Sequence, residues 1–144
     1  MKKQTILIII LLIVVILIVA FLVAQNVQKS RILANYNNQY EVCKTKNVYG
    51  TDIATLINMA IDNNEKNNIP KDDKDYYIPD DENSVKIYLK LQEEGENFPM
   101  ERIFKLGIIE FVKNFNLETF KCTKINYHSK TGKVSEVYFE YIQN

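Results

Sequence analysis

Hydrophobic residues gather near the N-terminal end of the chain in one unbroken run. Positions 6–24 read ILIIILLIVVILIVAFLVA, nineteen consecutive apolar residues. A helix of that length spans roughly 28 Å, close to the hydrocarbon core of a bilayer at about 30 Å. Secretory signal peptides have shorter apolar regions, and a cut after Ala24 would place Leu22 where a small residue is required. We therefore predict an uncleaved transmembrane helix over residues 5–24 rather than a buried core helix.

The charges that flank this run indicate its orientation. Lys2 and Lys3 precede it, and Lys29 and Arg31 follow it. Because positive residues favour the cytoplasmic side, and the short tail also carries the amino terminus, we expect residues 1–4 in the cytoplasm. The bulk of the chain would then lie outside a cell membrane, with the lipid bilayer as the partner of the helix.

Helical periodicity continues beyond the membrane segment. Apolar side chains recur at spacings of three and four, which places them on one helix face: Leu33, Tyr36, Tyr40 and Cys43. Asn35, Asn37 and Asn38 are weak helix formers, so this stretch needs tertiary support. We predict a juxtamembrane helix extension over residues 25–48, followed by a folded domain over residues 49–144.

Three patterns predict the first elements of that domain. After Gly50, Thr51 is a suitable N-cap for an amphipathic helix with apolar residues at Ile53, Leu56, Ile57, Ala60 and Ile61. Strict alternation over residues 85–91 predicts a half-buried strand. A further helix is expected over residues 97–115, with Asn97 as its cap and Pro99 in its first turn.

The C-terminal residues have the pattern of a β-hairpin. The segments FKCTKINYH and VSEVYFEYI flank residues 129–132, where Gly132 can adopt a left-handed turn conformation. In that register Ile125 faces Val137 and Thr123 faces Phe139. We therefore predict an α+β fold, in which a long N-terminal transmembrane helix continues into a small domain with about three antiparallel strands and two further helices.

Composition excludes some classes of function. The chain has 18 Lys and Arg against 18 Asp and Glu, and a pI near 6.6, whereas nucleic-acid binders usually have a basic face and a high pI. The sequence has 16 Lys but only 2 Arg, together with abundant Ile and Asn. This bias indicates an AT-rich genome, such as that of a low-GC Gram-positive bacterium.

Two cysteines, Cys43 and Cys122, lie 79 positions apart. They cannot form a zinc site alone, because such sites normally need four ligands and His128 is the sole histidine. Outside the cell they can form one disulfide, worth about 4.5 kcal/mol by loop-closure arithmetic. Two buried free thiols are an equally good interpretation.

The remaining candidates for chemistry each have a structural alternative. His128 lies at the end of a hairpin strand, where we expect a solvated side chain. Acidic residues gather at 72–75 and 80–83, and converging carboxylates can bind Ca²⁺, but the spacing does not match a known calcium loop. We therefore expect a solvated loop in preference to a metal site.

Tyrosines and lysines suggest an interaction surface. Tyr76 and Tyr77 lie near the acidic loop, and Lys130 and Lys133 lie at the hairpin turn. Further members of such a surface lie along the hairpin: Lys121, Lys124, Tyr127, Tyr138 and Tyr141. Tyr is common at interfaces but equally suited to strands, so ordinary strand packing remains the alternative. Patches of opposite charge would favour head-to-tail association.

The sequence contains no recognisable catalytic or cofactor-binding motif. Gly-rich phosphate loops, G-x-S-x-G, H-E-x-x-H and cysteine clusters are all missing. We therefore expect no enzymatic activity, no cofactor and no resident metal.

The order of these elements resembles that of type IV pilins and pseudopilins. Those proteins have a short N-terminal segment, a hydrophobic helix that runs on out of the membrane, and an antiparallel sheet packed on its second half. This chain differs in having no Gly before the apolar run and no Glu between Met1 and Gln25. It also resembles small membrane-anchored proteins of clostridia-like bacteria.

The resemblance implies a structural or assembly subunit that associates with itself or with a membrane protein complex. The alternative is a monomeric anchored binding module for a protein or ligand at the cell surface. The apolar run is almost all Ile, Leu and Val, large residues that hinder close packing of membrane helices, which favours a plain anchor.

Overall fold

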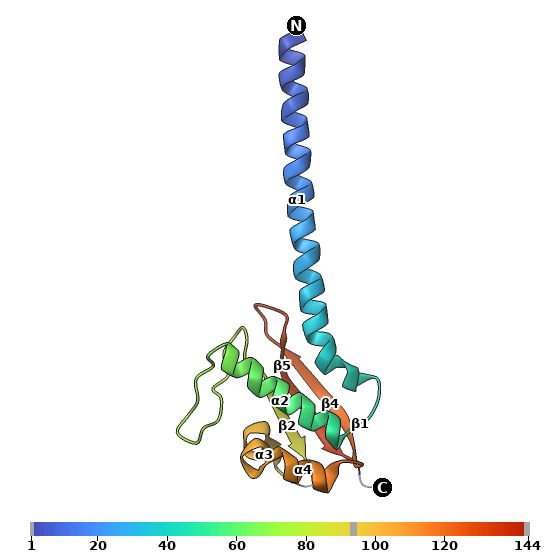
Figure 1. Ribbon diagram of the computed structural model, residues 1–144, viewed down its shortest axis with the longest axis vertical. Coiled ribbons are helices and arrows are strands. Elements are labelled where there is room, and N and C mark those ends of the chain that lie inside the picture. The colour runs from blue at the N-terminus through green and yellow to red at the C-terminus, as the bar shows by residue number, and fades with distance from the viewer. Residues whose placement is uncertain (1, 93–94, 143–144) are drawn as a thin grey trace. The chain divides into compact units, whose positions relative to one another are not determined.

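The structure is a computed structural model that describes residues 2–92 and 95–142 (Figure 1). The chain forms two compact units, Met1–Asn35 and Tyr36–Asn144. One helix, α1 (Lys2–Glu41), supplies the first unit and continues into the second. The second unit therefore contains the last turns of α1 in addition to the region predicted as the domain.

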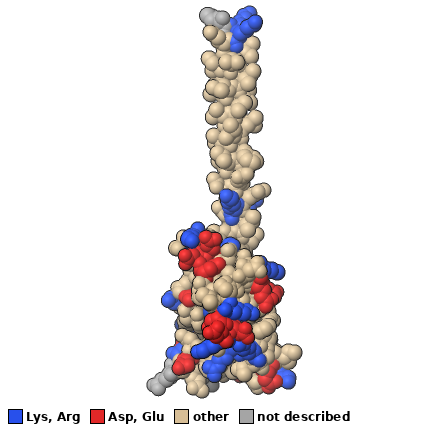
Figure 2. Space-filling model, turned by 90° about the vertical axis from the view of Figure 1, so that its left-hand side faces the viewer, with Lys and Arg blue, Asp and Glu red and all other residues tan. Residues whose placement is uncertain are grey.

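Between Ile6 and Ala24, helix α1 is apolar on all sides. Side chains of its large hydrophobic residues between Ile6 and Val23 are 46–71% exposed, and no charged residue occurs between Lys3 and Lys29. Figure 2 shows the same lack of charge on the visible face. In the part of the chain that the structure describes, this is the one helix long and apolar enough to cross a membrane. It is compatible with a single membrane anchor.

The second unit is built on a mixed sheet of five strands. Its order is β1 (Val48–Tyr49), β4 (Thr119–Tyr127), β5 (Val134–Tyr141), β2 (Lys86–Lys90) and β3 (Asn97–Pro99). The β2–β5 pair is parallel, and the other pairs are antiparallel. Pro99 ends an edge strand, which is where a residue without a backbone N–H is tolerated.

The expectation of about three antiparallel strands is therefore wrong. Strands β1 and β3 have two and three residues, too few to display an alternating pattern in the sequence. The parallel β2–β5 pair requires a long crossover, which the chain makes through β3, two helices and β4. The coarser prediction, an α+β domain behind a long N-terminal helix, is confirmed.

Three further helices belong to this unit, one more than predicted. Helix α2 (Gly50–Lys66) packs against the sheet and against both α3 (Met100–Leu106) and α4 (Ile108–Phe115). The single helix expected over 97–115 is split at Gly107, whose φ of 103° is a conformation that favours glycine. Asn97 lies in β3 and is not a helix cap.

The start of α2 is set by packing and by a carboxylate. Helix α2 begins at Gly50, where an added Cβ would lie 2.0 Å from the Phe115 carbonyl oxygen of α4. The backbone N–H of Tyr49 donates to the Asp52 carboxylate at 3.0 Å. The N-cap residue is therefore Tyr49, not the predicted Thr51, and Asp52 in the first turn accepts from its backbone N–H. The predicted apolar stripe of α2 is confirmed, since the following members are all buried: Ile53, Leu56, Ile57, Ala60 and Ile61.

The predicted hairpin is present, but its register shifts twice, between Cys122 and Lys124 and between Asn126 and Tyr127. Ile125 pairs with Val137 as expected, but Phe139 pairs with Cys122 and not with Thr123. The register shifts between Cys122 and Lys124, and the Thr123 hydroxyl donates to the Tyr138 carbonyl oxygen at 3.3 Å. A β-bulge at this point adds one residue to β4, which the alternating sequence pattern does not reveal.

Two buried asparagines connect helices to the sheet. Asn37 of α1 donates to the Gly132 carbonyl at 2.8 Å and accepts from the Val134 N–H at 2.9 Å. Asn64 of α2 donates to the Val85 carbonyl and accepts from the Val85 N–H, both at 2.8 Å. Each amide therefore satisfies one backbone C=O and one N–H at or just before the start of β5 or β2.

Candidate functional surfaces

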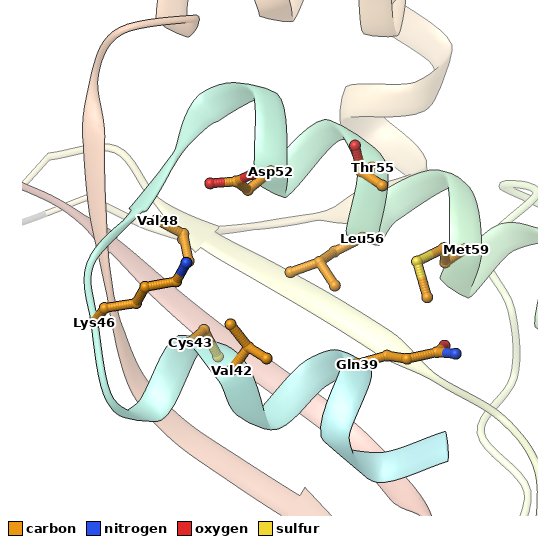
Figure 3. A pocket seen from close by; sticks show the side chains of 9 residues that line it. All are labelled: Gln39, Val42, Cys43, Lys46, Val48, Asp52, Thr55, Leu56 and Met59. Atoms are coloured by element: carbon orange, nitrogen blue, oxygen red, sulfur yellow. The ribbon is translucent and has the colours of Figure 1, made fainter. Parts of the chain in front are cut away.

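A groove of about 420 Å³ lies in the second unit. Figure 3 shows one wall formed by the end of α1 and the 3₁₀ helix η1 (Val42–Lys44), and the opposite wall formed by α2. Val42 and Leu56 face one another across it, while Lys46 and Asp52 lie at one end. The remaining lining residues are Gln39, Cys43, Val48, Thr55 and Met59. The groove is thus mainly apolar, with one charge of each sign.

The two cysteines come together beside this groove. Cys43 of η1 is buried and donates to the Tyr40 carbonyl at 2.8 Å, and Cys122 of β4 is half-buried. Both are free thiols, and η1 packs on β4. A hydrogen bond to Cys122 and burial raise the pKa of Cys43, whereas the same hydrogen bond lowers the pKa of Cys122. Cys122 is therefore the more readily ionised and more nucleophilic thiol.

The acidic loop uses its carboxylates to shape its own backbone. Asp72 accepts from the N–H groups of Lys74 and Tyr76 at 2.9 and 2.8 Å. Asp80 accepts from Glu82, Asn83 and Ser84 at 3.1, 2.7 and 2.7 Å. Burial opposes ionisation of Asp80, but these amides outweigh it and lower its pKa to about 2. Among the described residues, no group of three or more His, Cys, Asp or Glu is arranged to hold a metal.

The predicted hairpin lysines contact this loop within the same chain. Lys130 lies 3.4 Å from Glu82 and 3.7 Å from Asp81, and all three side chains are more than half exposed. The Lys133 ammonium donates to Asn83 at 2.6 Å. The opposite charges suggested for head-to-tail association thus already face one another in one molecule. Exposed pairs of this kind contribute little to stability.

The tyrosines are distributed over several environments. Tyr77 is 3% exposed and lies in the core, so it is not available at the surface, while Tyr76 is half-buried. Tyr138 stacks on Tyr88 with 4.8 Å between ring centroids, and Tyr141 donates to Glu118 at 2.7 Å. The Tyr127 hydroxyl bonds with both Glu41 and Lys44.

The expectation of a solvated His128 is wrong. The side chain is 7% exposed, and Nε2 lies 2.7 Å from the Ser84 carbonyl oxygen. The backbone of His128 also closes the turn, accepting from the Gly132 N–H at 2.9 Å and donating to the Lys133 carbonyl at 2.8 Å. His128 therefore joins the hairpin to the segment before β2, a long-range contact that its position at a strand end did not indicate.

Sequence reasoning also missed a buried ion pair. Lys86 of β2 and Glu101 of α3 are 5% and 3% exposed, and their charged atoms lie 2.6 Å apart. Glu101 also accepts from the Tyr77 N–H at 3.0 Å, and Lys86 donates to the Tyr77 carbonyl at 3.0 Å. Lys86 falls on the polar side of the alternating strand pattern, so no sequence signal distinguishes it from an exposed lysine.

Comparison with known proteins adds no further information. No protein-family model matches the chain, and neither a curated protein nor a solved structure shows significant similarity to it. Its function must therefore be argued from its own residues.

Mild oxidation of the full-length protein in detergent with copper phenanthroline should join Cys43 and Cys122. Because the two thiols interact, we expect one intrachain disulfide, detected as faster migration on a non-reducing gel and loss of alkylation after unfolding. The cross-link should raise the free energy of unfolding by up to about 4.5 kcal/mol. Cys122→Ser is the control. Two thiols that both remain alkylatable after unfolding would refute the pairing.

Acid should release the loop at an unusually low pH. The folded pKa of Asp80, about 2, lies below the ordinary value of about 3.9. Its stabilising contribution is therefore complete above about pH 4 and is lost as the pH falls through 2. The amide NMR shifts of Glu82, Asn83 and Ser84 should titrate with a midpoint near 2. A midpoint near 4 would show that the three amides do not hold this carboxylate.

Proposed function

We propose that this protein is a single-pass, membrane-anchored structural or assembly subunit of the pilin or pseudopilin type, with its second unit outside the cytoplasm. The observation that supports this most strongly is the uncharged helix surface of α1 between Lys3 and Lys29. A helix that is hydrophobic all round must be covered by lipid or by other apolar helices. Both environments occur in an assembly of membrane-anchored subunits.

The second unit offers a surface for contacts between subunits. Leu106, Ile109 and Leu117 are 73%, 75% and 80% exposed, and they lie on or next to α3 and α4. We call these three residues the α3–α4 patch. Large exposed apolar side chains close together in the chain favour protein–protein contact. A patch of this kind that fits a different surface of the next copy would extend an assembly by repetition.

The alternative function is a monomeric, membrane-anchored binding module. The groove between η1 and α2 favours it, because its volume of about 420 Å³ lies within the range of ligand pockets, about 300–1,000 Å³. An apolar segment of a partner protein would fit between Val42 and Leu56. Neither function requires catalysis, and we propose none.

Photo-crosslinking in cells tests the assembly function. A crosslinking amino acid at Ile109, in a C-terminally tagged full-length chain, should give a ladder of self-crosslinked species or crosslinks to a membrane complex identified by mass spectrometry. The matched control is the same substitution at Asp62, an exposed residue of α2 outside the α3–α4 patch. Adding Leu106→Ser and Leu117→Ser should reduce the crosslinked fraction at least about fivefold, because the apolar contact is lost.

Each outcome favours one function. A ladder that depends on the α3–α4 patch supports the assembly subunit. A monomer crosslinked to a single unrelated exported protein contradicts it and supports the binding module. Equal crosslinking from Ile109 and Asp62 would show that the patch has no role, which also contradicts the assembly proposal.

A further inference from the structure

The α3–α4 patch and the groove between η1 and α2 are apolar surfaces of opposite form. The patch protrudes, since its three side chains are 73%, 75% and 80% exposed. The groove is hollow and lies between the end of α1 with η1 on one side and α2 on the other (Figure 3). Its apolar lining comprises three buried side chains and two that are at least partly exposed: Cys43, Val48 and Leu56, and Val42 and Met59. A protruding apolar surface of the right size would remove these side chains from water.

The two surfaces are similar in length. Along α2 the groove extends from Asp52 to Met59, seven positions, or roughly 10 Å at the helix rise of about 1.5 Å per residue. The patch extends over eight positions from Ile109 to Leu117, roughly 12 Å, because Asn116 keeps a helical backbone beyond the end of α4. That spacing also places both residues on one side of the helix. Helix α4 of one copy is therefore long enough to lie along the groove of another.

The patch and the groove can meet only between copies. In its own chain the patch is exposed and does not fill the groove. Because the two surfaces differ, their contact is heterologous, so each copy offers a patch to one neighbour and a groove to the other. Such a contact repeats from copy to copy. A patch that packed on a second patch would instead form a closed dimer and leave both grooves empty.

The charges beside the two surfaces are complementary. Lys46 and Asp52 are the charged members of the groove lining, they lie at one end of it, and neither forms an ion pair among the described residues. Next to Ile109 on α4, Glu110 and Lys113 pair with one another at 3.2 Å, with side chains 61% and 66% exposed. Exposed pairs of this kind contribute little, so Glu110 can change its partner to Lys46 at small cost.

Other charged residues next to the patch and to η1 already have partners in the same chain. These partners are Asp75 for Lys105, Tyr141 for Glu118, the Phe98 ring for Arg102 and Glu41 for Lys44. The charges left for a contact between copies are therefore those at the end of the groove and those beside Ile109.

We propose that the α3–α4 patch of one copy docks in the groove of the next copy. Ile109 lies at the charged end of the groove with Glu110 paired to Lys46, and Leu117 lies towards Met59. This inference rests on the assembly function proposed above and deepens it, since it names a second copy of this chain as the occupant of the groove. Anchoring in one membrane would hold the copies at a high effective concentration, so each contact need only be weak.

Crosslinking between two differently tagged chains identifies the surface that Ile109 touches. A full-length donor chain with a photo-crosslinking amino acid at Ile109 is co-expressed with a full-length acceptor chain of the parent sequence. We expect a crosslinked species that carries both tags. Mass spectrometry should place the linked residue of the acceptor within 39–59, the range that lines the groove.

Two acceptor variants test the groove itself. Thr55 is an exposed member of the lining, so Thr55→Arg should leave the acceptor folded while it fills the groove with a large charged side chain. The yield of the doubly tagged species should fall at least about fivefold, because the apolar contact is blocked. The matched control is Asn58→Arg, an exposed position of the same helix outside the lining, which should leave the yield unchanged.

Charge reversal tests the pairing of Glu110 with Lys46. Lys46→Glu in the acceptor should lower the yield at least about threefold, because Glu110 of the donor then faces a like charge. Glu110→Lys in the donor should restore the yield with this acceptor. Both positions are exposed, so neither change should unfold the chain.

Linkage within residues 39–59 that is lost with Thr55→Arg and kept with Asn58→Arg supports the docking. Linkage to the acceptor's own α3–α4 patch or to another of its surfaces overturns the docking and leaves the assembly function standing. The docking is also overturned if Thr55→Arg does not lower the yield, or if Glu110→Lys does not restore the yield lost with Lys46→Glu. No doubly tagged species at all contradicts the assembly function, and the docking with it.

Discussion

Two buried side-chain amides hold the start of both central strands. Asn37 and Asn64 each donate to a carbonyl and accept from an N–H of the strand they face, at 2.8–2.9 Å. Strands β5 and β2 form the parallel pair of the sheet, and Val134 at the start of β5 and Val85 just before β2 are fully buried, so water cannot satisfy their paired backbone groups. Without these amides, three backbone groups of the buried residues Val85 and Val134, and the carbonyl of the half-buried Gly132, would lose their partners.

This constraint links the fold to the proposed role in the membrane. Because Asn37 belongs to α1, the last turns of the apolar helix are part of the folded unit that begins at Tyr36. Tyr40 at the end of α1 and Cys43 of η1 also belong to the hydrophobic core of this unit, where their side chains are only 1% and 4% exposed. The surfaces left for function are then those that this packing does not use: the α3–α4 patch and the groove beside Cys43.

Much of the fold follows from periodicity, and the rest depends on contacts between distant residues. The nineteen-residue apolar run, the stripe of α2 and the alternation in β2 and the hairpin are local patterns, and each element is present. Strands β1 and β3 are too short to have a pattern, and the β2–β5 pairing depends on a crossover. Asn64 lies four residues after Ala60 on the buried face of α2, so its burial was the one missed feature with a sequence signal.

The candidate sites could be predicted less well from the sequence than the fold. Their chemistry depends on which side chains are buried and not on residue type alone. Tyr77 and His128 are ordinary polar-tipped residues in the sequence, yet both are buried by segments more than twenty positions away. Lys86 and Glu101 are residue types expected at a solvated surface, yet they form a buried ion pair. The acidic loop has the composition of a metal site, but Asp72 and Asp80 bind its own backbone amides.

The free energy of unfolding of Asn37→Ala, compared with that of Asn38→Ala, tests the central constraint most directly. The two residues are neighbours in α1 and their replacement changes helix propensity equally, but Asn38 is exposed whereas Asn37 is buried and paired with β5. In urea titrations of the full-length protein in detergent, Asn37→Ala should be less stable than Asn38→Ala by at least about 2 kcal/mol, because the buried Val134 N–H and the half-buried Gly132 carbonyl lose their partner. Equal stability of the two variants would contradict this account.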